Sequence, residues 1–368
     1  MTDRDVEGLI EEISGSQDRL VREWEQLAAR VGATPFLYPG FVLAWQRAFD
    51  DRPLLLATVR HAGELVGALP LIRRGAVLVS PANWHTPETG VLVRDELAAS
   101  ELAGVIATAR PRRIALAFLD GADASVQAFR GEVERAGYRV LQRTLTRPPY
   151  LDLLGDWAAF ESGMASDVRA NLRRRHRRLE ERGAVVFEEE DGSSRLDRLF
   201  DEVVQVEGSG WKDERGTAIG SRADTLRFYR EIAGWAADRG WLRIHILRLD
   251  GRALAASLAL RCDRVHFHLK MGYDPEYRQL APGMLLMREL IHNAFAEGLR
   301  RVEMLGEDEA YKRVWCPETR ERIGLQAFAP SIAGNIDRLA FAHGRPLAKR
   351  LLANRLLGRL ATADGPRL

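Results

Sequence analysis

The sequence has few cysteines and no run of residues that looks like a leader. Its 368 residues include only Cys262 and Cys316, which lie far apart and form no CxxC pair. A disulfide framework is therefore not expected, and a reducing compartment fits better. Residues 1–17 are polar and acidic rather than basic and then apolar, so we expect no secretory signal and a cytoplasmic protein.

Long hydrophobic stretches and a strong net charge are also missing. No run of about 18 apolar residues occurs, so no transmembrane segment is expected. The formal net charge is only +2, which gives no general sign of a DNA-binding protein or of a membrane protein. Any electrostatic partner must be inferred from local clusters of charge.

The remaining composition is that of a globular protein with a sizeable core. Hydrophobic residues make up 46% and charged residues 29%. The length predicts two or three domains. A Pro-rich link at 146–149 divides the chain, so we expect one lobe over residues 1–150 and a second, with the active site, over residues 151–330. Residues 331–368 are expected to form a basic, amphipathic, helical tail.

A repeat relates the two halves. Residues 55–71 are expected to form two strands around a turn at Gly63, and residues 246–259 two strands around Asp250-Gly251. Superposing Gly63 on Gly251 keeps both strands in register. Two explanations of this similarity remain open. Any two hairpins have similar sequence patterns, or the chain holds two copies of one α/β lobe.

The stretch from Phe267 to Gly283 carries the clearest chemical pattern. A strand leads into a loop, and the loop leads into a helix that begins with Pro282 and Gly283. Proline suits the first helical position, and glycine lets a ligand approach the backbone amides. The positive end of such a helix is a ready site for a pyrophosphate, although many helices begin this way.

Two other segments place a carboxylate, an aromatic ring and a lysine together. Residues 306–312 follow the next strand, and residues 207–212 end an earlier helix. Binding residues gather at such element ends. A solvated charged loop anchored by a tryptophan explains each segment equally well.

Taken together, the motifs resemble the FemAB-like branch of the GNAT superfamily, including its acetyltransferases of cellulose-biosynthesis operons. The resemblance covers residues 34–328 and is most specific from Asp167 onward. The matching elements are Thr34 to Phe36 with Trp45; Asp167 to Arg173; Glu207, Gly210 to Lys212, Gly216 and Thr217; Gly272 to Asp274, Tyr277, Pro282 and Gly283; and Gly306, Glu307, Tyr311, Lys312 and Trp315.

The resemblance implies an α/β (α+β) fold with two GNAT-like lobes in tandem, each a twisted, mostly antiparallel sheet flanked by helices. It implies transfer of an acyl group to an amine of a small molecule, sugar or peptide. The donor would be acyl-CoA such as acetyl-CoA, or aminoacyl-tRNA as in the peptidyltransferase relatives. A third reading is a non-catalytic scaffold that binds a polyanion.

The family's pyrophosphate signature, Q/R-x-x-G-x-G/A, matches residues 278–283 here, and only Gly283 of its glycines is present. An acyl transfer also needs a base to deprotonate the amine, an acid for the leaving group and a group that stabilises the oxyanion. The resemblance implies that a strand backbone amide near Leu269 to Met271 takes this last role. The candidates for base and acid are Glu207, Glu307, Asp308 and Tyr311. Those for the donor are Arg278, Gln279, Ala281, Gly283 and Met284, and those for the other substrate are Asn171, Arg173, Trp211, Lys212, Lys270, Tyr273, Tyr277 and Lys312.

Two basic segments and one histidine pair complete the expectations. Seven arginines crowd residues 169–182, which suits tRNA or another polyanion, or an exposed helix balanced by glutamates. For the basic tail we expect docking on its own domain or on a second subunit of a homodimer; the alternative is an anionic membrane surface. His266 and His268 share a strand face, but no fourth ligand accompanies them, so no metal is expected.

Overall fold

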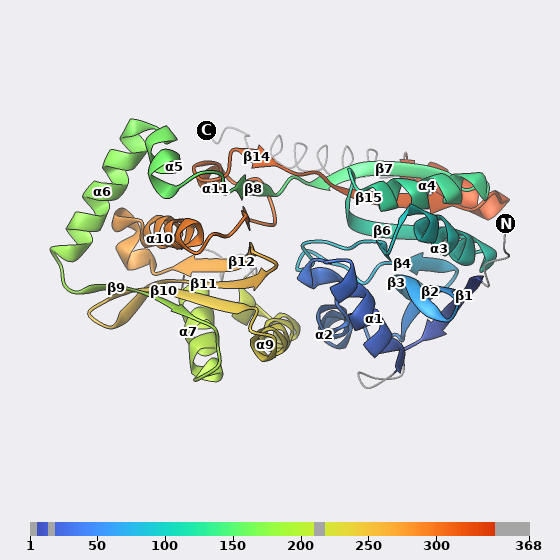
Figure 1. Cartoon of the computed structure of the whole chain (residues 1–368), viewed down its shortest axis with the longest axis horizontal. Coiled ribbons are helices and arrows are strands. Elements are labelled where there is room, and N and C mark those ends of the chain that lie inside the picture. Colours follow the sequence, from blue (N-terminus) through green and yellow to red (C-terminus); the bar gives the residue numbers. More distant parts are fainter. Residues whose placement is uncertain (1–5, 14–18, 210–217, 343–368) are drawn as a thin grey trace, which may run out of the picture.

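The computed structural model describes residues 6–13, 19–209 and 218–342. Two sheets lie side by side along the long axis, and helices cover both (Figure 1). The expected α/β fold with two lobes is therefore confirmed. Within the described ranges, no helix is long and apolar enough to cross a membrane.

The first half of the chain builds most of the first sheet and its helices. In α1, buried Leu20, Trp24 and Leu27 recur at three- and four-residue spacing, which explains why this segment is a helix with one face in the core. The elements are β1 (Val6–Glu12), α1 (Arg19–Arg30), η1 (Pro35–Leu37), α2 (Pro39–Phe49), β2 (Leu54–His61), β3 (Glu64–Arg74), β4 (Val77–Val79), β5 (Leu92–Val93), α3 (Glu96–Thr108), β6 (Arg113–Asp120), α4 (Ala124–Arg135), β7 (Arg139–Thr146) and β8 (Pro149–Asp152).

The second half repeats the plan after two helices that precede its sheet. Its elements are α5 (Trp157–Gly163), α6 (Ser166–Glu180), β9 (Val185–Glu190), α7 (Leu196–Gly208), η2 (Ile219–Ser221), α9 (Ala223–Asp238), β10 (Leu242–Leu249), β11 (Arg252–Cys262), β12 (Val265–Tyr273), η3 (Pro275–Leu280), α10 (Pro282–Ala296), β13 (Arg301–Glu303), α11 (Ala310–Arg313), β14 (Glu318–Thr319) and β15 (Arg322–Phe328). Residues 332–342 are helical.

The two hairpins match in detail. β2 and β10 have eight residues each, and β3 and β11 have eleven each. Their turns have positive φ at both central residues, 50° and 80° at Ala62 and Gly63, and 48° and 82° at Asp250 and Gly251. This is the backbone of a type I′ turn, which suits the twist of a hairpin. Each pair also carries one register shift close to its turn. The halves are therefore two copies of one lobe.

The lobes exchange one strand each. The first sheet runs β1-β2-β3-β4-β6-β15-β7, with β5 beside β3, and the second runs β9-β10-β11-β12-β13-β8-β14. β15 comes from the end of the chain and lies between β6 and β7. β8 comes from the end of the first half and joins β13 to β14. Residues 322–328 fall in the range expected for the second lobe, but they pair in the first sheet.

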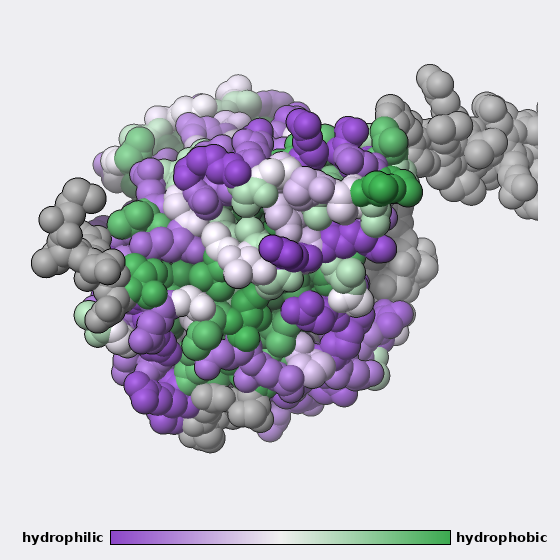
Figure 2. Space-filling model, turned by 90° about the vertical axis from the view of Figure 1, so that its right-hand side faces the viewer, coloured by the Kyte–Doolittle hydropathy of each residue, from purple (hydrophilic) through white to green (hydrophobic). Residues whose placement is uncertain are grey.

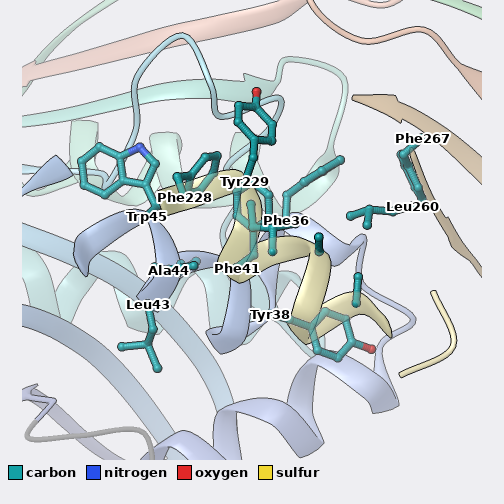
Figure 3. Close-up of a cluster of buried hydrophobic side chains, with 14 of the residues drawn as sticks. Phe36, Tyr38, Phe41, Leu43, Ala44, Trp45, Phe228, Tyr229, Leu260 and Phe267 are labelled. Carbon is teal, nitrogen blue, oxygen red and sulfur yellow. The ribbon is translucent and has the colours of Figure 1, made fainter. Parts of the chain in front are cut away.

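A shared hydrophobic core joins the lobes as well (Figure 3). Phe36 and Phe41 come from the first half, and Phe228 and Phe267 from the second. The Phe36 and Phe267 rings meet edge to face with centroids 5.3 Å apart, and those of Phe41 and Phe228 with centroids 5.5 Å apart. Because helix α2 packs on α9 through these rings, the two lobes form one packed unit.

Candidate functional site

The second sheet opens into a wedge at one end. β12 pairs in parallel with β13 only from Val265 to Phe267. β12 then continues to Tyr273, whereas β13 stops at Glu303. On its other side β12 pairs with β11, and a bulge at Leu269 leaves that residue out of the register. Bulges of this kind redirect the backbone next to functional sites.

A cavity of about 490 Å³ lies at this opening. The end of β12, the start of α10 and the segment before α11 enclose it. Its lining residues are Glu207, Met271, Gly272, Tyr273, Pro275, Arg278, Ala281, Gly283, Met284, Glu309 and Tyr311. The sequence-derived candidates Glu207, Tyr273, Arg278, Ala281, Gly283, Met284 and Tyr311 are thus brought together.

The start of α10 is arranged to receive an anion. Pro282 occupies the first turn, which contains no acidic residue, and the capping residue Ala281 offers no side-chain acceptor. Ala281 has φ of 48°, a left-handed conformation that glycine adopts more easily. A Cβ on Gly283 would meet Tyr273 Cδ1 at 3.5 Å and Met271 Cε at 3.6 Å. Glycine here therefore leaves the helix end open to the cavity.

The equivalent helix of the first lobe has a closed N-terminus. Asp95 caps α3, and its carboxylate accepts from the amide of Ala98. This bond holds the pKa of Asp95 below its usual value, so the helix end already carries an anion. The hollow beside β4, which Phe36, Leu37 and Phe41 help to line, holds only about 10 Å³. The larger cavity and the uncapped helix both belong to the second lobe.

Glu207 places a carboxylate at the cavity wall. It lies in the last turn of α7 with 1% of its surface exposed, and its Oε2 accepts from the amide of Ile219 at 2.8 Å. α7 approaches β12 so closely that a Cβ on Gly272 would lie 2.3 Å from the Glu207 Cα. Glycine at position 272 therefore fixes Glu207 against the strand that borders the wedge.

Tyr311 and Glu309 form the opposite wall. Burial, with the Glu309 carboxylate beside it, raises the pKa of the Tyr311 hydroxyl, so Tyr311 keeps its proton at neutral pH. Glu309 was not among the sequence-derived candidates, although its position two residues before Tyr311 was a usable signal. Arg278 is exposed at the rim and provides the cationic group of the cavity lining.

The remaining residues of this loop have other surroundings. Glu307 is exposed, and Asp308 pairs with Arg313 at 2.5 Å, which lowers the pKa of Asp308. Lys312 is buried, and its Nζ donates to the carbonyl oxygens of Leu305 at 2.8 Å and Glu307 at 3.0 Å. Glu307, Asp308 and Lys312 do not line the cavity, and Lys312 instead holds the loop in place.

Lys270 and Tyr277 lie beside the cavity rather than in its lining. The Lys270 ammonium sits 5.3 Å from the centre of the Tyr229 ring, between the lobes. The Tyr229 hydroxyl is 3.3 Å from Nδ1 of His85, whose pKa falls to about 4 through burial and the nearby Lys270. Tyr277 packs under the guanidinium of Arg252 at 5.3 Å.

The other candidates are spread more widely. Trp211 and Lys212 lie outside the described residues. Gln279 is exposed and outside the lining. On α6, the Asn171 side chain accepts from Arg174 and Arg175 at 3.0 Å, and Arg173 lies 3.5 Å from Glu161.

The strand histidines are core residues. His266 and His268 are both buried, and burial holds the pKa of His266 well below its usual value. In the three described ranges, no three His, Cys, Asp or Glu side chains converge as metal ligands would. Cys262 and Cys316 are both free thiols.

A family model described as an acetyltransferase (GNAT) domain matches residues 166–313, which include every residue of the cavity lining. Residues 166–313, which form most of the second lobe, are therefore similar to a GNAT acetyltransferase domain. A search of curated proteins finds no match. Placement in the branch of the cellulose-biosynthesis operons stays a prediction.

Solved structures of other proteins share the fold of this chain. FemX shares 12% identity with a TM-score of 0.59, over 89% of this chain and 99% of that one. The C-terminal domain of a protein described as a lysylphosphatidylglycerol synthetase from Agrobacterium fabrum shares 14%, with a TM-score of 0.54, over 87% and 95%. A conserved protein of unknown function from Bacteroides thetaiotaomicron shares 11%, also at 0.54, over 87% and 100%.

Proposed function

We propose that this protein is an N-acyltransferase that binds its acyl donor in the second-lobe cavity and transfers the acyl group to an amine. The observation that supports this most directly is the meeting of Glu207 with the uncapped start of α10 around one cavity. A helix N-terminus binds the donor's phosphates, and a buried carboxylate accepts a proton from the amine.

The reaction needs little covalent help from the protein. The amine nitrogen attacks the thioester carbonyl, the amide bond forms and the carbon–sulfur bond breaks. Glu207 takes the proton from the attacking nitrogen, and Tyr311, which stays protonated, donates one to the leaving thiolate. The backbone near Leu269, where β12 has parted from β13, is positioned to stabilise the oxyanion.

Acyl-CoA is the donor that the cavity favours. A pyrophosphate at Gly283 needs an uncapped amide and a cation nearby, and Arg278 lines the same cavity. Ala281 stands at the first glycine of the family signature and adopts the left-handed conformation that the glycine would provide. The missing glycine therefore does not remove the shape of the loop.

Titration calorimetry with acetyl-CoA and with free CoA tests the donor. We expect saturable binding, about tenfold or more weaker in Gly283→Leu, whose side chain enters the cavity, and little changed in Gly283→Ala. Gly283→Ala is the matched control because its Cβ makes only ordinary contacts. The absence of binding to either ligand would refute acyl-CoA as the donor.

Aminoacyl-tRNA is the second candidate donor, and α6 is the observation that favours it. Of its arginines, Arg173 and Arg177 approach carboxylates, at 3.5 Å and 3.7 Å, while Arg174 and Arg175 donate to the uncharged side chain of Asn171. A helix with this excess of positive charge suits a phosphate backbone. Filter binding of charged tRNA, with strong salt dependence, would support this donor if CoA fails to bind.

A further inference from the structure

The loop between β4 and β5 carries an indole ring in an open position. Trp84 is 75% exposed, and its ring and that of Phe118 meet edge to face with centroids 5.7 Å apart. Phe118 has φ of 59°, a left-handed conformation that is unfavourable for a bulky side chain. Backbone strain of this kind gathers at ligand sites, where the surrounding fold holds it in place. The residue that supports Trp84 therefore points to a binding role for this ring.

Hydrogen bonds to β6 hold the loop on both sides of Trp84. The Ser80 amide donates to the carbonyl oxygen of Ala115 at 3.0 Å. The Thr89 amide donates to the carbonyl oxygen of Phe118, also at 3.0 Å. A ring that the fold already fixes loses little conformational freedom when a ligand stacks on it, and this favours binding.

The residue after Trp84 joins the loop to the second lobe beside the donor cavity. Nδ1 of His85 lies 3.3 Å from the Tyr229 hydroxyl, and the Lys270 ammonium lies 5.3 Å from the centre of the Tyr229 ring. Burial, together with the nearby Glu207 carboxylate, raises the pKa of Tyr229. Tyr229 thus contacts the loop and has the proposed base close by. A ligand that stacks on Trp84 therefore lies next to the residues that lead to Glu207.

Exposed apolar residues also occur at the far end of the first lobe. Leu9 on β1 and Leu97 on α3 are 52% and 49% exposed. Both elements lie at the end of the molecule away from the second lobe, where Figure 2 shows apolar surface among polar surface. Single exposed aliphatic residues of this kind are ordinary. Trp84 differs from them because an aromatic ring, a strained support and a link to the candidate site occur together.

The open position of Trp84 indicates which ligand suits it. Aromatic and aliphatic ligands gain most from a closed apolar pocket, whereas most of this ring is in water. A sugar ring has a face of C–H groups that packs on the negative face of an indole, and its hydroxyl groups stay hydrated at the rim. The Lys270 ammonium, with its donor hydrogens, suits the hydroxyl groups of a sugar that extends from Trp84 past Tyr229.

We propose that Trp84 selects the acceptor, and that the acceptor is the amine of an amino sugar within an oligosaccharide. This inference rests on the acyl transfer proposed above. One sugar ring stacks on Trp84, and the amine nitrogen of another unit attacks the thioester carbonyl beside Glu207. The amide bond forms at that nitrogen, and the carbon–sulfur bond of the donor breaks. Glu207 takes the proton from the nitrogen, and the leaving thiolate receives one from Tyr311.

Steady-state kinetics with acetyl-CoA and two amines test this. One amine is the disaccharide of glucosamine, and the other is n-butylamine, which has no ring. Trp84→Ala should raise KM for the disaccharide about tenfold, change kcat by less than about twofold, and leave both constants for butylamine unchanged. Trp84→Phe keeps an aromatic face and should recover part of the loss. Leu97→Ala is the matched control, because Leu97 is exposed on the same lobe and lies away from the site.

Saturation-transfer NMR with the same disaccharide and no donor separates the sugar site from the reaction. We expect transfer from the protein to the C–H protons of the sugar in the wild type and in Glu207→Gln. In Trp84→Ala the disaccharide should bind about tenfold more weakly. If no amine is acylated but this binding pattern holds, the acyl transfer is wrong and the sugar site on Trp84 stands.

Three results would overturn the proposal. One is a wild-type protein that shows no saturation transfer to the disaccharide. Another is a loss of binding in Trp84→Ala that is no larger than in Leu97→Ala. The third is an equal loss of activity on both amines in Trp84→Ala, which would make Trp84 a structural residue. Circular dichroism and thermal unfolding confirm that each variant is folded.

Discussion

Nη2 of Arg322 donates to Oε2 of Glu88 at 2.6 Å, joining two residues 234 positions apart in the chain. Arg322 is the first residue of β15, and its Nη1 also donates to Asp120 at 2.9 Å. Thr34 donates to the other oxygen of Glu88 at 3.4 Å. Burial raises the pKa of Glu88, and Arg322 opposes that shift. The exchanged strand is thus anchored by a buried ion pair.

Removing one partner of this ion pair should lower the free energy of unfolding more than removing both partners. We expect Arg322→Met to destabilise the protein by about 3–5 kcal/mol, because it leaves the Glu88 carboxyl buried without its cation. The double variant Arg322→Met/Glu88→Gln should recover part of that loss. Guanidinium unfolding measures both, and a single-variant cost below about 1 kcal/mol would show that the ion pair does not anchor β15.

Glu207→Gln tests the base. The glutamine keeps an oxygen that accepts from the Ile219 amide, so the fold and donor binding should persist, while kcat falls by about 10²–10⁴. Glu307→Gln, at an exposed position, is the control and should leave kcat unchanged. The rate is measured with the donor identified by titration. Equal kcat values in the two variants would show that Glu207 is not the base.

Ala281→Gly should stabilise the protein. Ala281 has φ of 48°, a left-handed conformation. For a residue with a Cβ this conformation raises the free energy of the folded state by about 1–2 kcal/mol, whereas glycine adopts it without strain. Glycine loses more chain entropy on folding, so we expect a net gain of up to about 1 kcal/mol. Thermal unfolding of the two proteins measures it, and a lower melting temperature in Ala281→Gly would contradict the strain.

The buried histidines should make the protein acid-sensitive. Burial, with His245, His268, Arg261 and Arg243 nearby, keeps the pKa of His266 well below 6.5. The unfolded chain therefore binds the proton first, and stability falls as the pH drops below about 6.5. Both ring nitrogens of His266 are buried without a hydrogen-bond partner.

His266→Phe should therefore flatten this dependence. The phenyl ring fills a similar volume and takes up no proton, so stability at pH 5 relative to pH 8 should rise compared with the wild type. Urea unfolding at the two pH values measures the difference. An unchanged difference would mean that His266 is not the group that titrates.

The halves should not fold alone. Residues 1–150 lack β15, which leaves β6 and β7 without their shared neighbour, and residues 151–368 lack half of β8. Exposed strand edges favour aggregation. We expect each fragment to aggregate by size exclusion and the co-expressed pair to form a soluble complex. A stable, monomeric fragment 1–150 with native strand content would contradict this.

Local rules were enough to predict much of the fold. Glycine turns between short strand-like segments predicted both hairpins, and the start of α10 followed from Pro282 and Gly283. These features depend on neighbours in the chain. The strand exchange depends on pairing between residues more than a hundred positions apart, which no local pattern encodes.

The residue types that line the cavity could be predicted from the sequence more readily than the orientation of the side chains. Glu207 and Tyr311 were found because their segments pair a carboxylate with an aromatic, and both line the cavity. Lys312 belongs to the same pattern, yet its ammonium turns to the carbonyl oxygens of its own loop. Packing against the rest of the fold decides the orientation of a loop side chain, and local sequence patterns do not predict that orientation.

The strand exchange also delays the completion of the first sheet while the chain is synthesised on the ribosome. β7 is complete at Thr146, but β15, which pairs with both β6 and β7, is finished only at Phe328, about 180 residues later. At about 5–20 residues per second, the nascent first lobe waits roughly 9–36 s with its sheet unfinished. During that interval its edges are open to other chains, so newly made protein should depend on chaperones far more than the mature protein does.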